Sequence, residues 1–286
     1  MVEVRHHSPK CIVEQVAEGP TVAKALDPRL FSVAARDETK RLLVEYHKAV
    51  FSAFVNDGLI HSDIHLGNAV QGVVDDKGTT GFILFDVGQF DRIAVPETIA
   101  LLWTLSSISS IERRTTLRHV ALTHLAEVST LTPELSAALA EEVRRGGAAA
   151  AAGGGDAKAL AALDKKVAVR RAEELRLRLW EAYAESIEPL RDGTLPNQRA
   201  AYMLLLRAAE KRGILLPNGS FSVAKMVDGI ISQQKAYDLE NVLDDGIEAF
   251  LRNRMSWQEL GSIMYQSVRY SAGTLVHGKS DERMEG

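Results

Sequence analysis

The segment Ile60-His61-Ser62-Asp63-Ile64-His65-Leu66-Gly67-Asn68, followed by Leu84-Phe85-Asp86-Val87-Gly88, decides how this chain of 286 residues is interpreted. Apolar residues recur at three- and four-residue steps between positions 37 and 56, which predicts an amphipathic helix. Gly58 closes that helix, because glycine readily adopts the conformation that ends helices. The first segment therefore lies in a loop directly after a helix, and this loop holds Asp63 and Asn68 five positions apart.

A β-hairpin is predicted to follow the loop. The runs 68–74 and 81–86 are apolar and partly β-branched, and the polar residues 75–80 separate them. Because paired strands return the chain to its starting point, we expect Asp86 to lie beside Asn68. The sequence thus predicts a carboxylate, an amide oxygen and a second carboxylate in one pocket.

This set of side chains is typical of phosphoryl transfer. Mg²⁺ prefers oxygen ligands, commonly one or two carboxylates together with phosphate oxygens. Asn68 and Asp86 would hold the metal, and Asp63 would orient the attacking hydroxyl group and accept its proton. The alternative is a loop and hairpin in which Asp and Asn serve only as common turn residues.

The loop sequence resembles a known group of proteins. Residues 61–68 resemble the H-x-D-x-H-x-G-N signature of the UbiB/ADCK-type atypical kinases, and residues 85–88 resemble their D-F-G. Residues 13–19 resemble their hinge strand, in which an acidic residue precedes a Glu-Gly turn. The resemblance covers roughly residues 10–130 and implies a protein-kinase-like C-lobe.

The resemblance also assigns roles to individual residues. By resemblance, the catalytic residues are Asp63 and His65, and the residues that contact the nucleotide or its metal are Glu14, Val16, Asn68 and Asp86. His65 would orient Asp63 or the neighbouring backbone, and a purely structural role for it stays open. The family further implies ATP and Mg²⁺ as cofactors and an unidentified phosphate acceptor. It also implies a link to quinone or lipid pathways, through peripheral contact with a membrane or with proteins of those pathways.

The chain departs from this family in two respects. Ile64 and Leu66 stand where the family usually has prolines, and Val87 replaces the phenylalanine of D-F-G. The sequence begins at the hinge, without a Gly- or Ala-rich nucleotide loop, a strand lysine for the phosphates or a partner-helix glutamate. We therefore expect an N-lobe that is largely absent, and weak or no turnover without one. No lysine can be nominated from the sequence for the phosphate role.

Two further interpretations stay open. Small-molecule phosphotransferases of the aminoglycoside and choline type also carry H-x-D-x-H-x-x-N and a Glu-Gly hinge, and Gly88 favours the UbiB-type assignment over them. The third interpretation is a catalytically inactive, kinase-like binding module. Such a module should tolerate Asp63→Asn without loss of function.

The composition excludes several classes of protein. Lys and Arg number 34 and Asp and Glu 38, so the formal net charge is −4, which gives no electrostatic footprint for nucleic acid. Cys11 is the only cysteine, so an intrachain disulfide is excluded, as in reducing compartments. The longest uncharged stretch, 98–111, is shorter than a membrane-spanning helix. We expect an intracellular protein, cytoplasmic or organellar, with a peripheral membrane association left open.

The predicted fold class is α+β and predominantly helical, a kinase-like C-lobe with a small β-hairpin and extra C-terminal helices. Helices are expected near residues 97–109, 111–127, 133–145, 157–187, 197–211, 222–238, 244–253 and 256–270. The expected parts are a kinase-like core (1–145), a flexible Ala/Gly linker (146–156), a helical part of the same lobe (157–272) and a disordered tail (273–286).

Overall fold

The computed structural model describes residues 4–8, 11–14, 18–84, 89–148, 157–190 and 192–256, together with 258 and 261. The chain divides into two units, and each unit is built from two segments. The first comprises residues 1–94 and 221–249, and the second comprises residues 95–220 and 250–286. Helices predominate, and the small sheets are antiparallel pairs of strands, which confirms the predicted α+β class.

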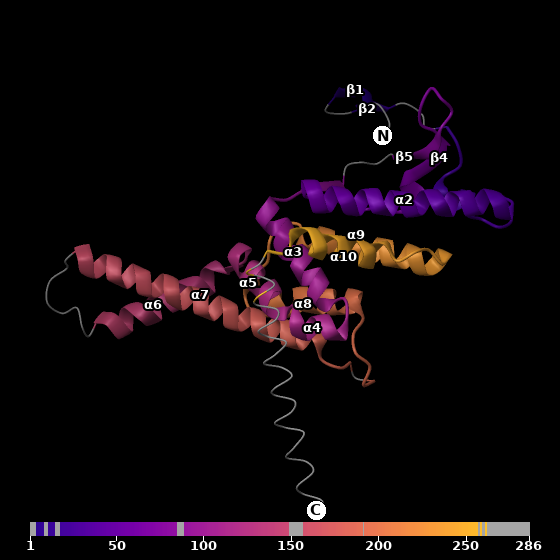
Figure 1. The fold of residues 1–286 in the computed structure, drawn as a ribbon. Helices are drawn as coiled ribbons and strands as arrows, with labels where there is room; N and C mark the ends of the chain where they lie inside the picture. The colour runs from indigo at the N-terminus through magenta and orange to yellow at the C-terminus, as the bar shows by residue number, and fades with distance from the viewer. Residues whose placement is uncertain are drawn as a thin grey trace, which may run out of the picture. The chain divides into compact units, whose positions relative to one another are not determined.

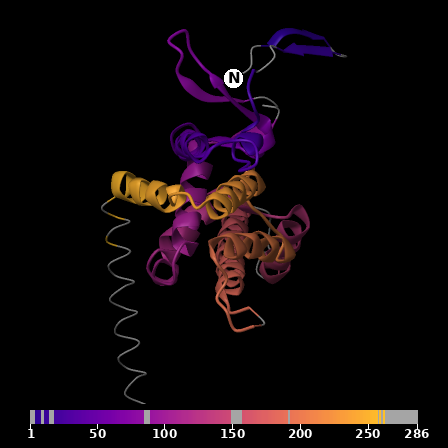
Figure 2. The ribbon, with the colours of Figure 1, turned by 90° about the vertical axis from the view of Figure 1, so that its right-hand side faces the viewer.

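The first unit holds the segment that decided the sequence interpretation. Its early elements are β1 (Val4–Ser8), β2 (Cys11–Glu14), α1 (Val22–Ala25), α2 (Val33–Asp57), β3 (Leu59–His61), the 3₁₀ turn η1 (Leu66–Asn68), β4 (Ala69–Val73), β5 (Thr80–Leu84) and β6 (Phe90–Arg92). Most of α9 (Ser220–Tyr237) and of α10 (Val242–Arg254) also belongs to it. Two views of the ribbon show α9 near α2 (Figure 1 and Figure 2), and the two helices meet where Gln233 lies beside His47.

Helix α2 is longer than predicted, and its ends have clear causes. The Ser32 side chain caps the start by accepting a hydrogen bond from the Ala35 amide. Gly58 caps the end with a φ of 64°, as its position in the sequence predicted. The chain then enters β3 directly, so the end of α2 sets where the following loop begins.

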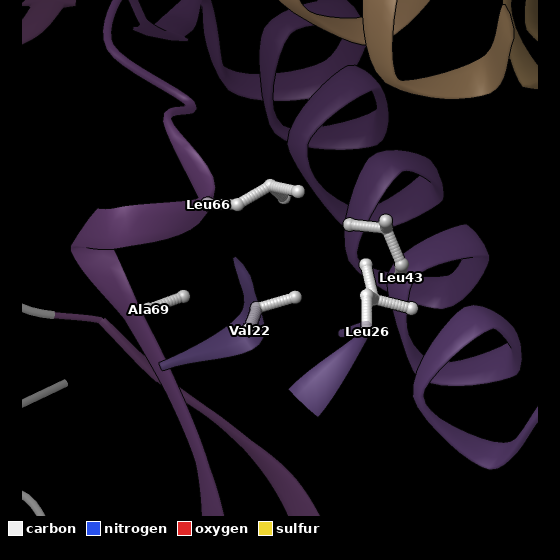
Figure 3. Packing of buried hydrophobic residues seen from close by; sticks show 5 residues of the cluster. All are labelled: Val22, Leu26, Leu43, Leu66 and Ala69. Carbon is white, nitrogen blue, oxygen red and sulfur yellow. The ribbon is translucent and has the colours of Figure 1, made fainter. Parts of the chain in front are cut away.

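The predicted hairpin is confirmed. Strands β4 and β5 pair in antiparallel register, with Ala69 opposite Leu84 and Val73 opposite Thr80. The base of the hairpin packs on a small apolar cluster, whose buried members point toward one another (Figure 3): Val22, Leu26, Leu43, Leu66 and Ala69. Because these residues come from α1, its C-cap, α2, η1 and β4, burying them joins the loop and the hairpin to the helices.

The turn before α1 lies against β4. The Pro20 carbonyl accepts a hydrogen bond from the Gln71 amide. Gly19 has a φ of 129°, and a Cβ at that position would overlap the Gln71 carbonyl oxygen. Glycine is therefore required at this turn, both for its backbone conformation and because the turn approaches β4 closely.

The second unit is almost entirely helical. It contains α3 (Val95–Ile108), α4 (Ile111–Thr116), α5 (Arg118–Val128), β7 (Thr130–Leu131), α6 (Pro133–Ala148), α7 (Ala157–Ile187), α8 (Gln198–Lys211) and β8 (Ile214–Leu215). Helix α3 packs on α5, and α7 packs on both α6 and α8. Figure 1 shows α6 and α7 as an elongated antiparallel pair.

The structure alters some predicted boundaries. The helix expected over 111–127 is divided at Leu117, which ends α4 and precedes α5. Helix α6 extends to Ala148, so residues 146–148 of the expected linker are helical, and residues 149–156 lie outside the described residues. The tail expected over 273–286 also lies outside them, as does nearly all of the helix expected over 256–270.

The grouping of segments also differs from the predicted parts. The predicted core, 1–145, placed the hairpin and the following helices together, whereas the chain enters the second unit at Val95 and α9 returns to the first. Among the described residues, no helix is both long enough and apolar enough to cross a membrane.

Candidate active-site loop

The loop between β3 and β4 carries the predicted catalytic residues. Strand β3 pairs with β6, with Ile60 opposite Asp91, and this pairing fixes the start of the loop. At its far end η1 leads directly into β4. Within the loop, Asn68 Nδ2 donates a hydrogen bond of 2.8 Å to Asp63 Oδ2. The structure therefore brings together Asp63 and Asn68 as the sequence predicted.

The same hydrogen bond orients the Asn68 side chain. A carboxylate only accepts hydrogen bonds, so the amide nitrogen must face Asp63 and the amide oxygen must face the other way. No described residue donates a hydrogen bond to that oxygen. An amide oxygen held in this way fits the ligand preference of Mg²⁺.

The second predicted metal ligand, Asp86, lies outside the described residues. The strand register brings Leu84 opposite Ala69, the residue after Asn68, and Asp86 follows Leu84 by two positions in the sequence. Within the described ranges, no three His, Cys, Asp or Glu side chains gather into a metal-binding group.

His65 has a local structural role in the loop. It is the N-cap of η1, and its Nδ1 accepts a hydrogen bond of 3.0 Å from the Gly67 amide. A Cβ on Gly67 would stand only 2.7 Å from the His65 ring, so glycine allows this turn to close. The part that the sequence interpretation gave His65 in orienting Asp63 stays a prediction.

His61 supports the loop from below. Its ring is buried and stacks on Phe90 of β6, with centroids 4.4 Å apart and ring planes 18° apart. This burial gives His61 a structural role at the base of the loop. Both the amide and the hydroxyl of Ser62 donate hydrogen bonds to the Gln89 carbonyl oxygen, which continues the β3–β6 pairing into the loop.

A buried polar chain holds the middle of the loop, and sequence analysis missed it. Gln233 of α9 donates from Nε2 to the Ile64 carbonyl oxygen at 2.5 Å, and its Oε1 lies 2.8 Å from Nε2 of His47 in α2. His47 is completely buried, and Gln233 is 9% exposed. These two hydrogen bonds connect α2 and α9 to Ile64, the residue next to Asp63. Their only sequence signal was a pair of polar residues on otherwise apolar helix faces.

The geometry decides the protonation of His47. Because Gln233 gives its amide nitrogen to Ile64, its oxygen must accept from His47, which places the histidine proton on Nε2. The Nδ1 atom of His47 is buried without a hydrogen-bond partner. A proton there would be a buried, unpaired donor. Burial accordingly lowers the pKa of His47 below its ordinary value of 6.5, against a smaller opposing effect of the Gln233 hydrogen bond.

This shift predicts how stability depends on pH. Between the lowered folded pKa and the unfolded value near 6.5, the unfolded chain binds more protons at His47 than the folded chain. The His47 contribution is therefore present above pH 6.5 and lost as the pH falls toward the folded pKa. As the pH falls, the unfolding free energy of the wild type declines. Replacing His47 with glutamine should make that decline less steep, by up to about 1.4 kcal/mol per pH unit. Urea unfolding of both proteins between pH 7.5 and 5.5 measures this, and parallel pH profiles would contradict it.

A cavity of about 600 Å³ opens between the loop and α9. The lining comes from three regions: Ala23, the loop residues Ser62–Leu66 with Gln89, and the α9 residues Lys225, Asp228, Gly229, Ser232, Gln233, Ala236 and Tyr237. A Cβ on Gly229 would overlap the Ile64 side chain, so glycine lets the helix approach the loop this closely. The pKa of the Tyr46 phenol in α2 is raised above its ordinary value. Burial is the larger cause, and the negative charge of Asp63 is the smaller one.

The predicted hinge residues are only partly described. Glu14 ends β2, opposite Val4 of β1, and its side chain lies outside the described residues, as does Val16. The nucleotide contacts assigned to these two residues by resemblance therefore stay predictions. No known protein family, curated protein or solved structure matches this chain.

Proposed function

We propose that this protein is a UbiB/ADCK-like atypical kinase or ATPase that carries out ATP- and Mg²⁺-dependent phosphoryl transfer. The observation that carries the proposal is the 2.8 Å hydrogen bond between Asn68 and Asp63, which joins the aspartate and the asparagine of the signature. Its setting adds support, because a helix and a short strand precede the loop and an antiparallel hairpin follows it. This is the order of elements that the resemblance to a kinase-like C-lobe implies.

In this proposal each residue has a distinct task. Asp63 accepts a hydrogen bond from the acceptor hydroxyl and takes its proton as the hydroxyl attacks. Asn68 holds Asp63 in place and would present its amide oxygen to the metal, and Asp86 would be the anionic metal ligand. Bound Mg²⁺ would neutralise charge on the phosphate groups. Glu14 and Val16 would contact the nucleotide. The phosphate acceptor is unidentified, and the link to quinone or lipid pathways follows from the resemblance alone.

A small-molecule phosphotransferase remains the second candidate within enzymes. The cavity favours it, because a space of about 600 Å³ beside Asp63 has the size of a pocket for a small organic acceptor. A non-catalytic binding module is the alternative from another class, and it predicts no requirement for the Asp63 carboxylate.

Replacing Asp86 with asparagine should weaken the binding of MgADP by at least about tenfold, because a hard cation loses an anionic ligand. Isothermal titration calorimetry of the full chain measures the dissociation constant. Asp76→Asn is the matched control, because this exposed residue of the hairpin loop removes the same charge away from the site. Equal affinities of the wild type and Asp86→Asn would remove Asp86 from the metal site.

A further inference from the structure

The cavity beside Asp63 is lined by a positively charged side chain, Lys225, which the sequence analysis did not connect with the loop. Its α9 lining residues recur at alternating steps of three and one along the helix, so they form a single face: Lys225, Asp228, Gly229, Ser232, Gln233, Ala236 and Tyr237. Lys225 stands near the start of this face, on an exposed part of the helix, within the same cavity as Asp63.

Two contacts of α9 show which part of the loop lies next to Lys225. Ser222 donates a hydrogen bond to the carboxylate of Asp91, which is opposite Ile60 in the β3–β6 pair. Further along the helix, Gly229 abuts Ile64. The loop and α9 thus advance in the same direction. Lys225 falls between these two contacts, which places it alongside the residues from Ile60 to Ile64, with Asp63 among them.

The two carboxylates that line the cavity accept hydrogen bonds from described residues, whereas the ammonium group of the lysine makes none with them. Asp63 accepts from Asn68, and Asp228 accepts from Ser232 at 3.3 Å. Lys225 is the only Lys or Arg among the lining residues, and in the described part of the chain it has neither an ion pair nor a hydrogen bond to its ammonium group. The Nδ1 atom of His65 is already engaged, because it accepts the hydrogen bond from the Gly67 amide.

We propose that Lys225 is the cation of this site and holds a phosphate-type anion beside Asp63. A phosphate group that approaches the Asp63 carboxylate meets a like charge, and an ammonium group in the same cavity offsets that repulsion. Lysine binds phosphate well as a flexible point charge with three donors. The inference deepens the proposed function and rests on it for the identity of the anion, either the terminal phosphate of the nucleotide or a phosphate on the acceptor.

The direct test uses inorganic tripolyphosphate, which requires no nucleotide pocket. Calorimetric titration of the full chain at low ionic strength should give a dissociation constant that rises about ten- to hundredfold in Lys225→Ala, the range of one charge-assisted hydrogen bond. Lys225→Arg should retain most of the affinity. Lys235→Ala is the matched control, because Lys235 is an exposed lysine of α9 outside the cavity lining, and it should change the constant less than twofold.

Two further titrations identify the source of the anion. If Lys225 holds the terminal phosphate of the nucleotide, Lys225→Ala weakens MgATP more than MgADP. If it holds a phosphate on the acceptor, the variant loses inorganic phosphate binding in the presence of saturating MgADP. Failure of wild-type protein to bind nucleotide would count against the proposed function and leave a Lys225-dependent tripolyphosphate site standing. Absence of tripolyphosphate binding, or equal constants for Lys225→Ala and Lys235→Ala in every titration, would overturn the inference.

Discussion

Replacing Asp63 with asparagine should lower the rate of ATP turnover by about 10²–10⁴-fold, the usual contribution of a positioned general base. Asparagine has nearly the shape of aspartate, and its amide oxygen still accepts the 2.8 Å hydrogen bond from Asn68. The loop should therefore stay in place while the site loses its proton acceptor. Release of inorganic phosphate by the purified full chain, with MgATP in excess, measures the rate.

Asp57→Asn is the matched control for this experiment. Asp57 is the exposed last residue of α2, in the same unit, so the variant removes an equal charge away from the loop. Its turnover should equal that of the wild type. Unchanged turnover in Asp63→Asn, with a normal unfolding transition, would reject the catalytic role of Asp63. Absence of turnover in the wild type itself would favour the non-catalytic binding module.

Replacing Gln233 with leucine should lower the free energy of unfolding by about 2–6 kcal/mol. The substitution removes the acceptor of the completely buried His47 and the donor to the Ile64 carbonyl oxygen in one step. Each buried polar group that loses its partner is destabilising by about 1–3 kcal/mol. A loss of this size is a large share of the ~5–15 kcal/mol that stabilises a typical domain. Equilibrium unfolding in urea measures it at constant pH.

The neighbouring residue provides a sharp control. Gln234 is as buried as Gln233, at 9% exposure, but its Nε2 has no hydrogen-bond partner. Gln234→Leu should therefore be neutral or stabilising. The double variant His47→Leu, Gln233→Leu should recover part of the loss, because replacing both partners of a buried hydrogen bond leaves fewer groups unpaired. Equal losses for Gln233→Leu and Gln234→Leu would show that the hydrogen bonds of Gln233 do not stabilise the loop.

The local features of the first unit could be predicted from the sequence, because they depend on neighbouring residues. The end of α2 at Gly58 follows from the left-handed conformation that glycine accepts. The β4–β5 hairpin follows from two apolar runs around a polar loop. The approach of Asn68 to Asp63 follows from a spacing of five residues within a single loop. In each case few residues separate the groups that meet, so the sequence alone determined these contacts.

Only the tertiary structure decided what surrounds the loop. The sequence predicts a helix near residues 222–238, but it does not say which surface of the protein that helix meets. The pairing of β3 with β6, the bond from Gln233 to Ile64 and the place of Lys225 in the cavity of Asp63 all join segments far apart in the sequence. Such contacts form because packing buries several helices together, and no local propensity encodes which helices those are. The loop itself was therefore predictable from the sequence. The side chains that surround it, Gln233 and Lys225, could be placed only from the tertiary structure.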